Sequence, residues 1–349
     1  MVSIATVMPR KTSAIFIGVD AGPRATLEPI ARAWRGVLES HIYDSAEKWA
    51  GRMAEADAHL VVVGTSDSAS GRAVEAAARV AARRAAIPLA NVEDYPGNYL
   101  PVEGGDADLL VVESEAAIKL VRTRLGSRCP QAIAISPARF DPMRLHSDSN
   151  RRSMHTRWLA SRARDEPAAL LWIGQPETED ALATLKILVP SLQAGGWRLL
   201  FRAHPRDTAY TAGAYRSIMQ ALGGCFTDLT DLGAAEVFAQ APSLVVTQFS
   251  SMVVEAGFHG IPSLCLLFPG AGMDCLYRKK GYRTPLVCDA GAVGLCTEPD
   301  QLQRMIQQLI EHGQVRHDTL TRFDSYFGTA TTTATTSVEA LKTLLFKGK

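Results

Sequence analysis

The sequence predicts an α/β protein with two parallel-sheet domains in series. Its 349 residues are more than one hydrophobic core usually serves, since domains of roughly 150 to 200 residues are typical. Short runs rich in Val, Ile and Leu alternate with Ala-rich stretches, as in strands buried on both faces and joined by crossover helices. This rhythm stops once, over residues 141–166, where the chain is polar and rich in arginine. We therefore expect an N-terminal domain over 1–140, a basic linker over 141–166 and a C-terminal domain over 167–328.

The elements of the N-terminal domain follow from its apolar runs. The expected strands are 14–19, 59–64, 88–93, 109–113 and 132–136. The expected helices are 26–38, after a Gly-Pro turn, then 71–86 and 114–125. The last of these opens with Ser114, whose hydroxyl can cap the first turn. Together these elements predict one open α/β sheet.

A second α/β series begins after the linker. The expected strands are 169–173, 198–202, 225–228, 243–247, 263–267 and 285–288, and the expected helices are 178–192, 210–222, 233–240, 251–259 and 300–312. Two similar halves, each Rossmann-like, imply a central cleft between them. Ligands of such folds bind where the carboxyl ends of the strands face the cleft.

Composition narrows the class of protein further. A chain with 47% hydrophobic and 21% charged residues is globular rather than disordered, collagenous or coiled-coil. The 37 Lys and Arg residues nearly balance the 36 Asp and Glu residues, so we expect no nucleic acid partner. The six cysteines form no CxxC pair, which favours a reducing compartment. No apolar run approaches the ~20 residues of a membrane helix, so the predicted location is cytoplasmic.

A histidine follows the strand at 198–202, in the run Ala203, His204, Pro205 and Arg206. An imidazole at a strand's carboxyl end can give a hydrogen bond or a proton to a phosphate oxygen, because its ordinary pKa lies near neutrality. Arg206 beside it can hold an oxyanion. An isolated His-Pro pair is more often only a strand end, so this assignment needs a second motif.

The second motif follows the strand at 243–247. Ser250 and Ser251 open the next helix, and hydroxyls with unpaired backbone N–H groups at a helix start form an anion site. Glu255 lies four residues after Ser251 on the same helix face, where a carboxylate could accept both hydroxyls of a ribose. Taken alone, the same residues would be an ordinary capping arrangement.

The order of these motifs resembles a known family. Residues 202–207, then 245–251 about forty residues on, Glu255 and Gly260-Ile261-Pro262 are similar to the C-terminal half of GT-B-type bacterial surface-polysaccharide transferases. These include CDP-glycerol glycerophosphotransferases and the transferases that use CMP-activated sialic acid or Kdo. The resemblance covers roughly 170–345. It implies that the His204-Pro205 pair and the Ser250-Ser251 pair contact the donor phosphate, and that a C-terminal helix over 329–349 packs back on the first domain.

The acceptor side of the reaction requires a base in the N-terminal half. Strand 88–93 ends in Glu93 and Asp94, and sialyltransferases of this type carry an acidic pair followed by Gly, where Tyr95 stands here. The resemblance implies that one of the pair deprotonates the acceptor, although an Asp before Pro-Gly also forms turns. A second candidate is Asp20 after the first strand, where a polar residue can also simply begin a loop.

A rival with the same fold is the UDP-N-acetylglucosamine 2-epimerase group. Its corresponding helix usually begins with Gly-Gly, whereas Ser250 and Ser251 stand here, and the chain has no His-Arg-x-Glu-Asn run. No metal-ligand cluster or glycine-rich phosphate loop is visible. We therefore expect no metal and no cofactor other than a nucleotide-activated donor substrate.

Two basic stretches could meet an anionic acceptor or make peripheral contact with an anionic membrane surface. One is the set of linker arginines, and the other is Arg278-Lys279-Lys280 with Arg283. Such runs are more often solvated faces.

The sequence thus predicts a metal-independent GT-B-like glycosyltransferase of polysaccharide biosynthesis. It would move a sugar, or a glycerol-phosphate-like unit, from a cytidine-linked donor to a hydroxyl of a glycan, glycolipid or protein. The alternatives are a UDP-sugar 2-epimerase or hydrolase, and a non-catalytic module that binds nucleotide-sugars.

Overall fold

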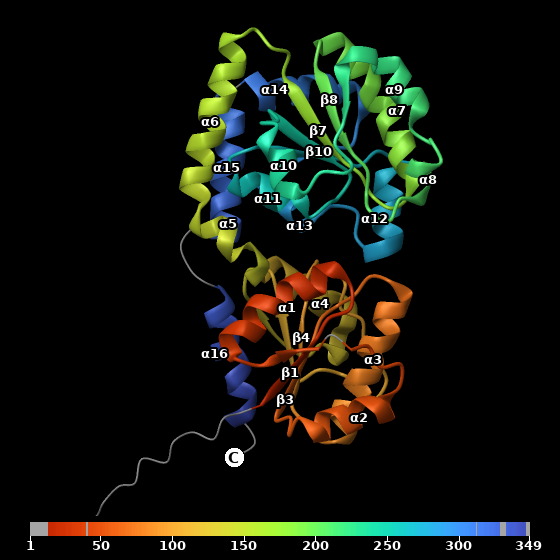
Figure 1. Ribbon diagram of the computed structural model, residues 1–349, viewed down its shortest axis with the longest axis vertical. Helices are drawn as coiled ribbons and strands as arrows, with labels where there is room; N and C mark the ends of the chain where they lie inside the picture. Colours follow the sequence, from red (N-terminus) through yellow and green to blue (C-terminus); the bar gives the residue numbers. More distant parts are fainter. Residues whose placement is uncertain (1–12, 40, 312, 329–332, 347–349) are drawn as a thin grey trace, which may run out of the picture. The chain divides into compact units, whose positions relative to one another are not determined.

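The computed structural model describes residues 13–39, 41–311, 313–328 and 333–346, except for the side chains of 161–163 and 346. The chain divides into two compact units (Figure 1). Unit 1 comprises Met1–Asp141 with Thr332–Lys349, and unit 2 comprises Pro142–Thr331. Residues 1–12, 329–332 and 347–349 of the expected terminal segments lie outside the described residues.

Unit 1 contains a sheet of six parallel strands in the described part of the chain. They are β1 (Ala14–Ile17), β2 (Val37–Leu38), β3 (Leu60–Val63), β4 (Leu89–Val92), β5 (Leu109–Val112) and β6 (Gln131–Ala134). Their order is β2-β1-β3-β4-β5-β6, so the direction of winding reverses between β1 and β3. The five predicted strands are confirmed. Strand β2 was not among them because two residues are too short to form a recognisable apolar run.

The helices of unit 1 are α1 (Ala21–Trp34), α2 (Ala46–Glu55), α3 (Ala69–Arg84), α4 (Glu115–Leu125) and α16 (Thr333–Phe346). The helix predicted over 26–38 is wrong at both ends. Pro23 lies in the first turn of α1, where backbone N–H groups lack helical partners and a proline is tolerated. The helix ends at Trp34 because Arg35 adopts a left-handed conformation with φ 60°.

The C-terminal helix α16 packs on α1 within unit 1. Val338 and Leu341 of α16 share one core cluster with Leu27 of α1 and with alternate residues of the strands. Asp141 caps this helix: its Oδ1 accepts from Thr333 N at 3.0 Å, and its Oδ2 accepts from Ala334 N at 3.0 Å. A buried carboxylate thereby joins the end of the first chain segment to the start of the last one.

Unit 2 repeats the architecture. Its described strands are β7 (Ala169–Ile173), β8 (Arg198–Arg202), β9 (Phe226–Asp228), β10 (Leu244–Thr247), β11 (Ser263–Leu266) and β12 (Gly294–Cys296). They are all parallel, in the order β12-β11-β10-β7-β8-β9, and the winding reverses between β7 and β10. The strand predicted at 285–288 is wrong, because this short apolar run forms the helical turn α13 (Leu286–Asp289).

The longer helices of unit 2 are α6 (Ser147–Ala163), α7 (Thr178–Gly195), α12 (Gly272–Lys280), α14 (Leu302–Glu311) and α15 (Gln314–Phe327). Shorter ones are α5 (Asp141–Leu145), α8 (Thr208–Thr211), α9 (Arg216–Leu222), α10 (Ala234–Ala239) and α11 (Met252–Phe258). The helix predicted over 210–222 is divided between α8 and α9, where Gly213 has a φ of 79°. The expected linker over 141–166 contains α5 and α6, and Arg151 of α6 pairs with Asp324 of α15 at 2.6 Å.

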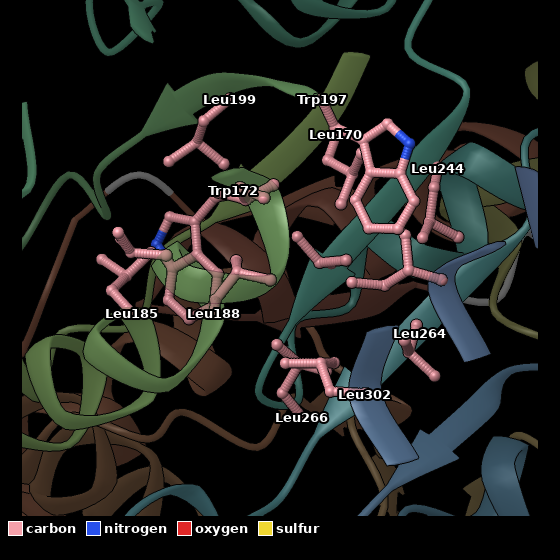
Figure 2. Packing of buried hydrophobic residues seen from close by; sticks show 14 of the residues in the cluster. Leu170, Trp172, Leu185, Leu188, Trp197, Leu199, Leu244, Leu264, Leu266 and Leu302 are labelled. Atoms are coloured by element: carbon pink, nitrogen blue, oxygen red, sulfur yellow. The ribbon is translucent and has the colours of Figure 1, made fainter. Parts of the chain in front are cut away.

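The core of unit 2 shows why its strands are so apolar. Leu170 and Trp172 of β7 pack on the face covered by α7 and α14, while Leu171 and Ile173 pack on the face covered by α6, α10 and α11. Figure 2 shows the indole of Trp172 beside residues of α7. Strands buried on both faces need apolar residues at successive positions. Among the described residues, no helix combines the length and hydrophobicity needed to cross a membrane.

Candidate functional site

The loops after β7, β8 and β10 meet at the carboxyl edge of the unit 2 sheet. Gly174 N, after β7, donates to Arg202 O at 2.8 Å, and Thr247 Oγ1, at the end of β10, donates to Ile173 O at 2.8 Å. A Cβ atom at position 174 would lie 3.0 Å from His204 N, so the small glycine permits this approach. The two motifs singled out in the sequence therefore flank the end of one strand, at the point where the winding reverses.

His204 is half-buried and its tautomer follows from its neighbours. Its Nδ1 accepts a hydrogen bond from Arg206 N at 3.0 Å, so the ring proton is assigned to Nε2. Burial, followed by the positive charge of Arg206, lowers the pKa of His204 to about 4. At neutral pH the imidazole is therefore an uncharged group that can donate a hydrogen bond from Nε2.

The buried side chain of Asp207 anchors the loop that carries His204. This side chain is 4% exposed, and it accepts hydrogen bonds from Thr178 Oγ1 at 2.6 Å and Tyr215 Oη at 2.5 Å. The preceding residues Pro205 and Arg206 are both exposed. The buried carboxylate thus fixes the loop while the guanidinium of Arg206 remains accessible to an anion.

The two serines behave differently from each other. Ser250 Oγ accepts from Met252 N at 3.3 Å, which leaves its hydroxyl proton to donate elsewhere. Ser251 occupies the position before α11 but makes no side-chain cap hydrogen bond. Helix α11 has only seven residues and ends at Phe258, one residue earlier than predicted. Glu255 lies one turn beyond Ser251 and is half-buried.

Arg202, the last residue of β8, belongs to this edge although the sequence gave it no role. Its guanidinium is half-buried, and its Nη1 donates to Met252 Sδ at 3.0 Å. A thioether is a weak acceptor, and Arg202 Nε has no hydrogen-bond partner among the described residues. A poorly satisfied cation beside the first residue of α11 favours an anionic ligand at this point. The only sequence signal for it is an arginine in the last position of a buried strand.

The carboxyl edge of the unit 1 sheet is acidic instead. The loops after β1, β3 and β4 converge there: Asp20 bonds the loop after β3, and Thr65 of that loop bonds Asp94 after β4. The Oδ2 of Asp20 accepts from Asp67 N at 2.9 Å and from Ser68 N at 2.8 Å, and its Oδ1 accepts from Ser68 Oγ at 2.6 Å. The carboxylate of Asp20 is thus occupied in holding the loop after β3.

Asp94 is half-buried at the same edge. Its Oδ1 accepts from Thr65 Oγ1 at 2.9 Å and from Asn98 Nδ2 at 3.0 Å, while its own N–H donates to Thr65 Oγ1. Its Oδ2 lies so close to Gly22 in α1 that a Cβ atom at position 22 would overlap it. A side chain at position 22 would therefore displace the carboxylate of Asp94.

Glu93 points the opposite way from Asp94, into the protein. Its side chain is 3% exposed, its Oε1 accepts from Tyr99 N at 2.9 Å, and its Oε2 has no hydrogen-bond partner in the described part of the chain. Burial raises the pKa of Glu93 to about 8, so this carboxyl is protonated at neutral pH. Adjacent carboxyl groups therefore occupy different environments, as strand alternation predicts.

Glu75 of α3 is a further carboxyl at this edge that the sequence did not identify. It accepts from Ser66 N at 2.7 Å and Ser66 Oγ at 2.6 Å, and burial raises its pKa to about 7. No local pattern distinguishes it, since it stands in the middle of an Ala- and Arg-rich helix.

Several cationic side chains of the two basic stretches form ion pairs with carboxylates. Arg278 pairs with Asp180 at 3.0 Å and Lys279 pairs with Glu177 at 2.5 Å, while Lys280 is only 5% exposed. The linker residues Arg151 and Arg164 form ion pairs, Arg157 bonds a carbonyl, and the side chain of Arg162 lies outside the described residues. Arg278 and Arg164 remain exposed in their ion pairs, and contact of these stretches with an anionic acceptor or membrane surface stays a prediction.

No group of three or more His, Cys, Asp and Glu side chains is placed to hold a metal ion among the residues that the structure describes. The expected independence of metals and cofactors stays a prediction.

The chain is similar in structure to several solved proteins that hold a nucleotide or a nucleotide-sugar. No protein family and no curated protein matches the chain. Solved structures match it over both units. MnaA from S. aureus, solved with UDP, is 12% identical, with a TM-score of 0.65 over 96% of this chain and 97% of that one. HepE from Anabaena, in complex with UDP, is 14% identical, with a TM-score of 0.64 over 95% of this chain and 100% of that one. The UDP-GlcNAc 2-epimerase from Neisseria meningitidis, bound to UDP-GlcNAc, is 12% identical, with a TM-score of 0.62 over 95% and 100%.

The chain has a GT-B-like fold. Its two parallel six-stranded sheets with flanking helices confirm the predicted fold class. At such low identity the likeness carries the fold alone, because many reactions share one scaffold. The reaction has to be argued from the residues at the two sheet edges.

Proposed function

We propose that this protein is a GT-B-type transferase that moves a sugar, or a glycerol-phosphate-like unit, from a nucleotide-activated donor to a hydroxyl of a glycan, glycolipid or protein. The observation that carries the proposal is the set of hydrogen-bond donors around the end of β7. Arg202 ends β8, His204 lies in the loop that follows it, and Ser250 lies in the loop after β10; these segments supply the guanidinium, the imidazole Nε2 and the hydroxyl. Few ligands other than a phosphate would satisfy so many donors at once.

These donors would act on the leaving group. As the bond from the sugar to the phosphate breaks, negative charge grows on the phosphate oxygens, and donors fixed in advance stabilise it without reorganising. A neutral His204 suits this role because it donates without needing to be protonated first. Arg206 supplies positive charge at the exposed side, and Glu255 would accept the ribose hydroxyls.

Asp94 is the base that we propose for the acceptor hydroxyl. Its Oδ1 accepts two hydrogen bonds, and the side chain is half-exposed. Glu93 is buried and protonated, and Asp20 is occupied by the loop after β3. The environments of the three carboxyl groups thus support a division of roles in which Asp94 alone meets the acceptor.

A cytidine-linked donor is the finer part of the proposal, and it is supported only by the order of the motifs in the sequence. Several similar structures hold UDP or UDP-GlcNAc. They favour a second candidate function, a UDP-sugar 2-epimerase or hydrolase, for which a base and a proton donor at the acidic edge would also be needed. A module that binds nucleotide-sugars without turning them over is the non-catalytic alternative.

A panel of CMP-, CDP- and UDP-sugars separates these functions. Each donor would be incubated with the protein, with and without hydroxyl acceptors, and the products followed by chromatography and NMR. Acceptor-dependent release of the nucleotide supports the transferase. Interconversion of UDP-GlcNAc with its 2-epimer, or release of UDP without an acceptor, supports the second candidate. Thermal stabilisation by a nucleotide without any turnover of the panel would leave only the binding module.

A further inference from the structure

Unit 2 has a cavity that does not include the residues of the candidate site. It has a volume of about 390 Å³, which is in the range of small-molecule pockets. Its wall includes Pro242, just before β10, and Gly260, just before β11. The cavity therefore lies at the amino edge of the sheet, opposite the edge that carries His204 and Ser250.

One wall of this cavity carries a positive charge without a counterion. Arg316 of α15 is half-buried, and each hydrogen bond of its guanidinium goes to a backbone carbonyl: Ser243 O at 3.1 Å, Gly260 O at 3.0 Å and Leu309 O at 3.5 Å. No carboxylate among the described residues forms an ion pair with it. Burial alone lowers the pKa of Arg316 to about 10, in keeping with the lack of a neighbouring negative charge. The adjacent Arg151, in contrast, is neutralised by Asp324.

The remaining walls suit the body of an organic ligand. Met154, Trp158 and Leu320 provide apolar surface, and His155 stacks on Trp158 with 5.8 Å between the ring centroids. His155 and His317 are both exposed at the cavity. The cavity thus combines one uncompensated guanidinium with a flat, apolar and aromatic lining.

We propose that this cavity binds an organic anion, a small molecule with one phosphate or carboxylate group on a planar or apolar body. The anionic group neutralises Arg316, and the body packs on Trp158 and Leu320. A partly buried cation without a counterion is unfavourable, and an anion from solution supplies the negative charge that the described residues do not. The turn at Gly260 follows α11, whose other end carries Ser250 and Ser251, so one short helix lies between the two sites.

Isothermal titration calorimetry with 1-naphthyl phosphate tests the proposal on the full chain. We expect a dissociation constant below about 1 mM for the unaltered protein. Arg316→Gln removes the charge while keeping a donor for one carbonyl, and it should weaken binding about tenfold or more, as expected for a lost charge-assisted contact. Leu320→Trp keeps Arg316 but fills the cavity, and it should weaken binding as strongly. This second variant decides the question if Arg316→Gln fails to fold.

Three controls locate the binding. Arg304→Gln changes an exposed arginine of the same unit outside the cavity and should leave the affinity unchanged. His204→Ala should also leave it unchanged, because the probe is expected at the opposite edge. The uncharged analogue 1-naphthalenemethanol should bind much more weakly. The proposal is overturned if the probe does not bind, if Leu320→Trp binds as well as the unaltered protein, if His204→Ala abolishes binding, or if the uncharged analogue binds equally well.

Discussion

The carboxyl edges of the two sheets have the same topology and opposite chemistry. Each sheet has six parallel strands whose winding reverses once, and each edge gathers the loops that follow its central strands. In unit 1 those loops carry Asp20, Glu93 and Asp94, and in unit 2 they carry His204 and Ser250. One architecture therefore places carboxyl groups at one edge and an imidazole with a hydroxyl at the other.

Burial has the same effect at both edges, which is to remove charge. It raises the pKa of Glu93 to about 8 and lowers the pKa of His204 to about 4, so both groups are neutral near pH 7. Asp94 is less buried than Glu93, and Arg206 is less buried than His204. The comparison teaches that burial, by neutralising Glu93 and His204, removes opposite charges from the two edges.

The largest expected effect is that of Asp94→Asn. Loss of a general base should slow transfer about 100-fold to 10,000-fold, because the acceptor hydroxyl keeps its proton. Nucleotide affinity, measured by calorimetry, should change by less than about twofold, since the donor is bound by unit 2 in this proposal. Glu93→Gln and Asp20→Asn are the matched controls. If both controls keep full rates and Asp94→Asn does too, the acidic edge does not supply the base. If only Asp20→Asn abolishes transfer, the base is Asp20, in the loop after β1.

His204 tests the other edge with two amide substitutions. His204→Asn can keep an acceptor for Arg206 N but loses the Nε2 donor, and turnover should fall about 100-fold or more, as for a lost oxyanion donor. His204→Gln can place an amide N–H near the Nε2 position and should retain part of the rate. His146→Ala, an exposed histidine of the same unit, is the control. A folded His204→Asn protein with a near-normal rate would refute the assignment.

Glu93 should affect stability in a way that depends on pH. Its pKa is higher in the folded chain than in the unfolded one, so its contribution to stability is full below about pH 4.5 and is lost as the pH rises to about 8. Glu93→Gln mimics the protonated side chain. It should therefore stabilise the protein at pH 8 by on the order of a few kcal/mol relative to its effect at pH 5. Urea unfolding at the two pH values measures this difference, and equal effects at both would contradict a buried protonated Glu93.

The contribution of His204 to stability should depend on pH in the opposite direction to that of Glu93. Its pKa is lower in the folded chain, so its contribution to stability is present above about pH 6.5 and is lost as the pH falls towards 4. His204→Gln cannot be protonated and should show a smaller loss of stability over this window than the unaltered protein. Urea unfolding at pH 7 and pH 5 tests the prediction, with His146→Gln as the control. If His204→Gln and the unaltered protein lose the same stability between pH 7 and pH 5, the pKa of His204 is not lowered by folding.

The smallest expected effect is on the ribose contact. Glu255→Gln should weaken nucleotide binding by about 1 to 3 kcal/mol, the loss of a charge-assisted hydrogen bond. Glu298→Gln, at an exposed position of the same unit, should leave affinity unchanged. Calorimetry with CMP, CDP and UDP measures both variants, and unchanged affinities for all three nucleotides in Glu255→Gln would remove Glu255 from the site.

The elements that the sequence predicts best are those with a strong local signal. The apolar runs that become β3, β5, β7 and β8 are found close to their true bounds, because the residues in the middle of a strand buried on both faces are apolar at successive positions. The errors arise where a local signal is ambiguous. Residues 285–288 are apolar but form a turn of helix, and the polar run 141–166 is helical because α6 packs on α11 and α15.

The sequence by itself determined the α/β class, the loops in which His204, Ser250 and Asp94 lie, and the order of these motifs. These depend on periodicity and spacing along the chain, which are local. Only the tertiary structure decided which carboxyl of the acidic pair is buried, that Arg202 faces α11, that Glu75 joins the acidic edge and that no described carboxylate pairs with Arg316. Each of these depends on the exposure and partners of a side chain. Residues distant in the sequence supply both, as the carbonyls of Ser243, Gly260 and Leu309 do around Arg316.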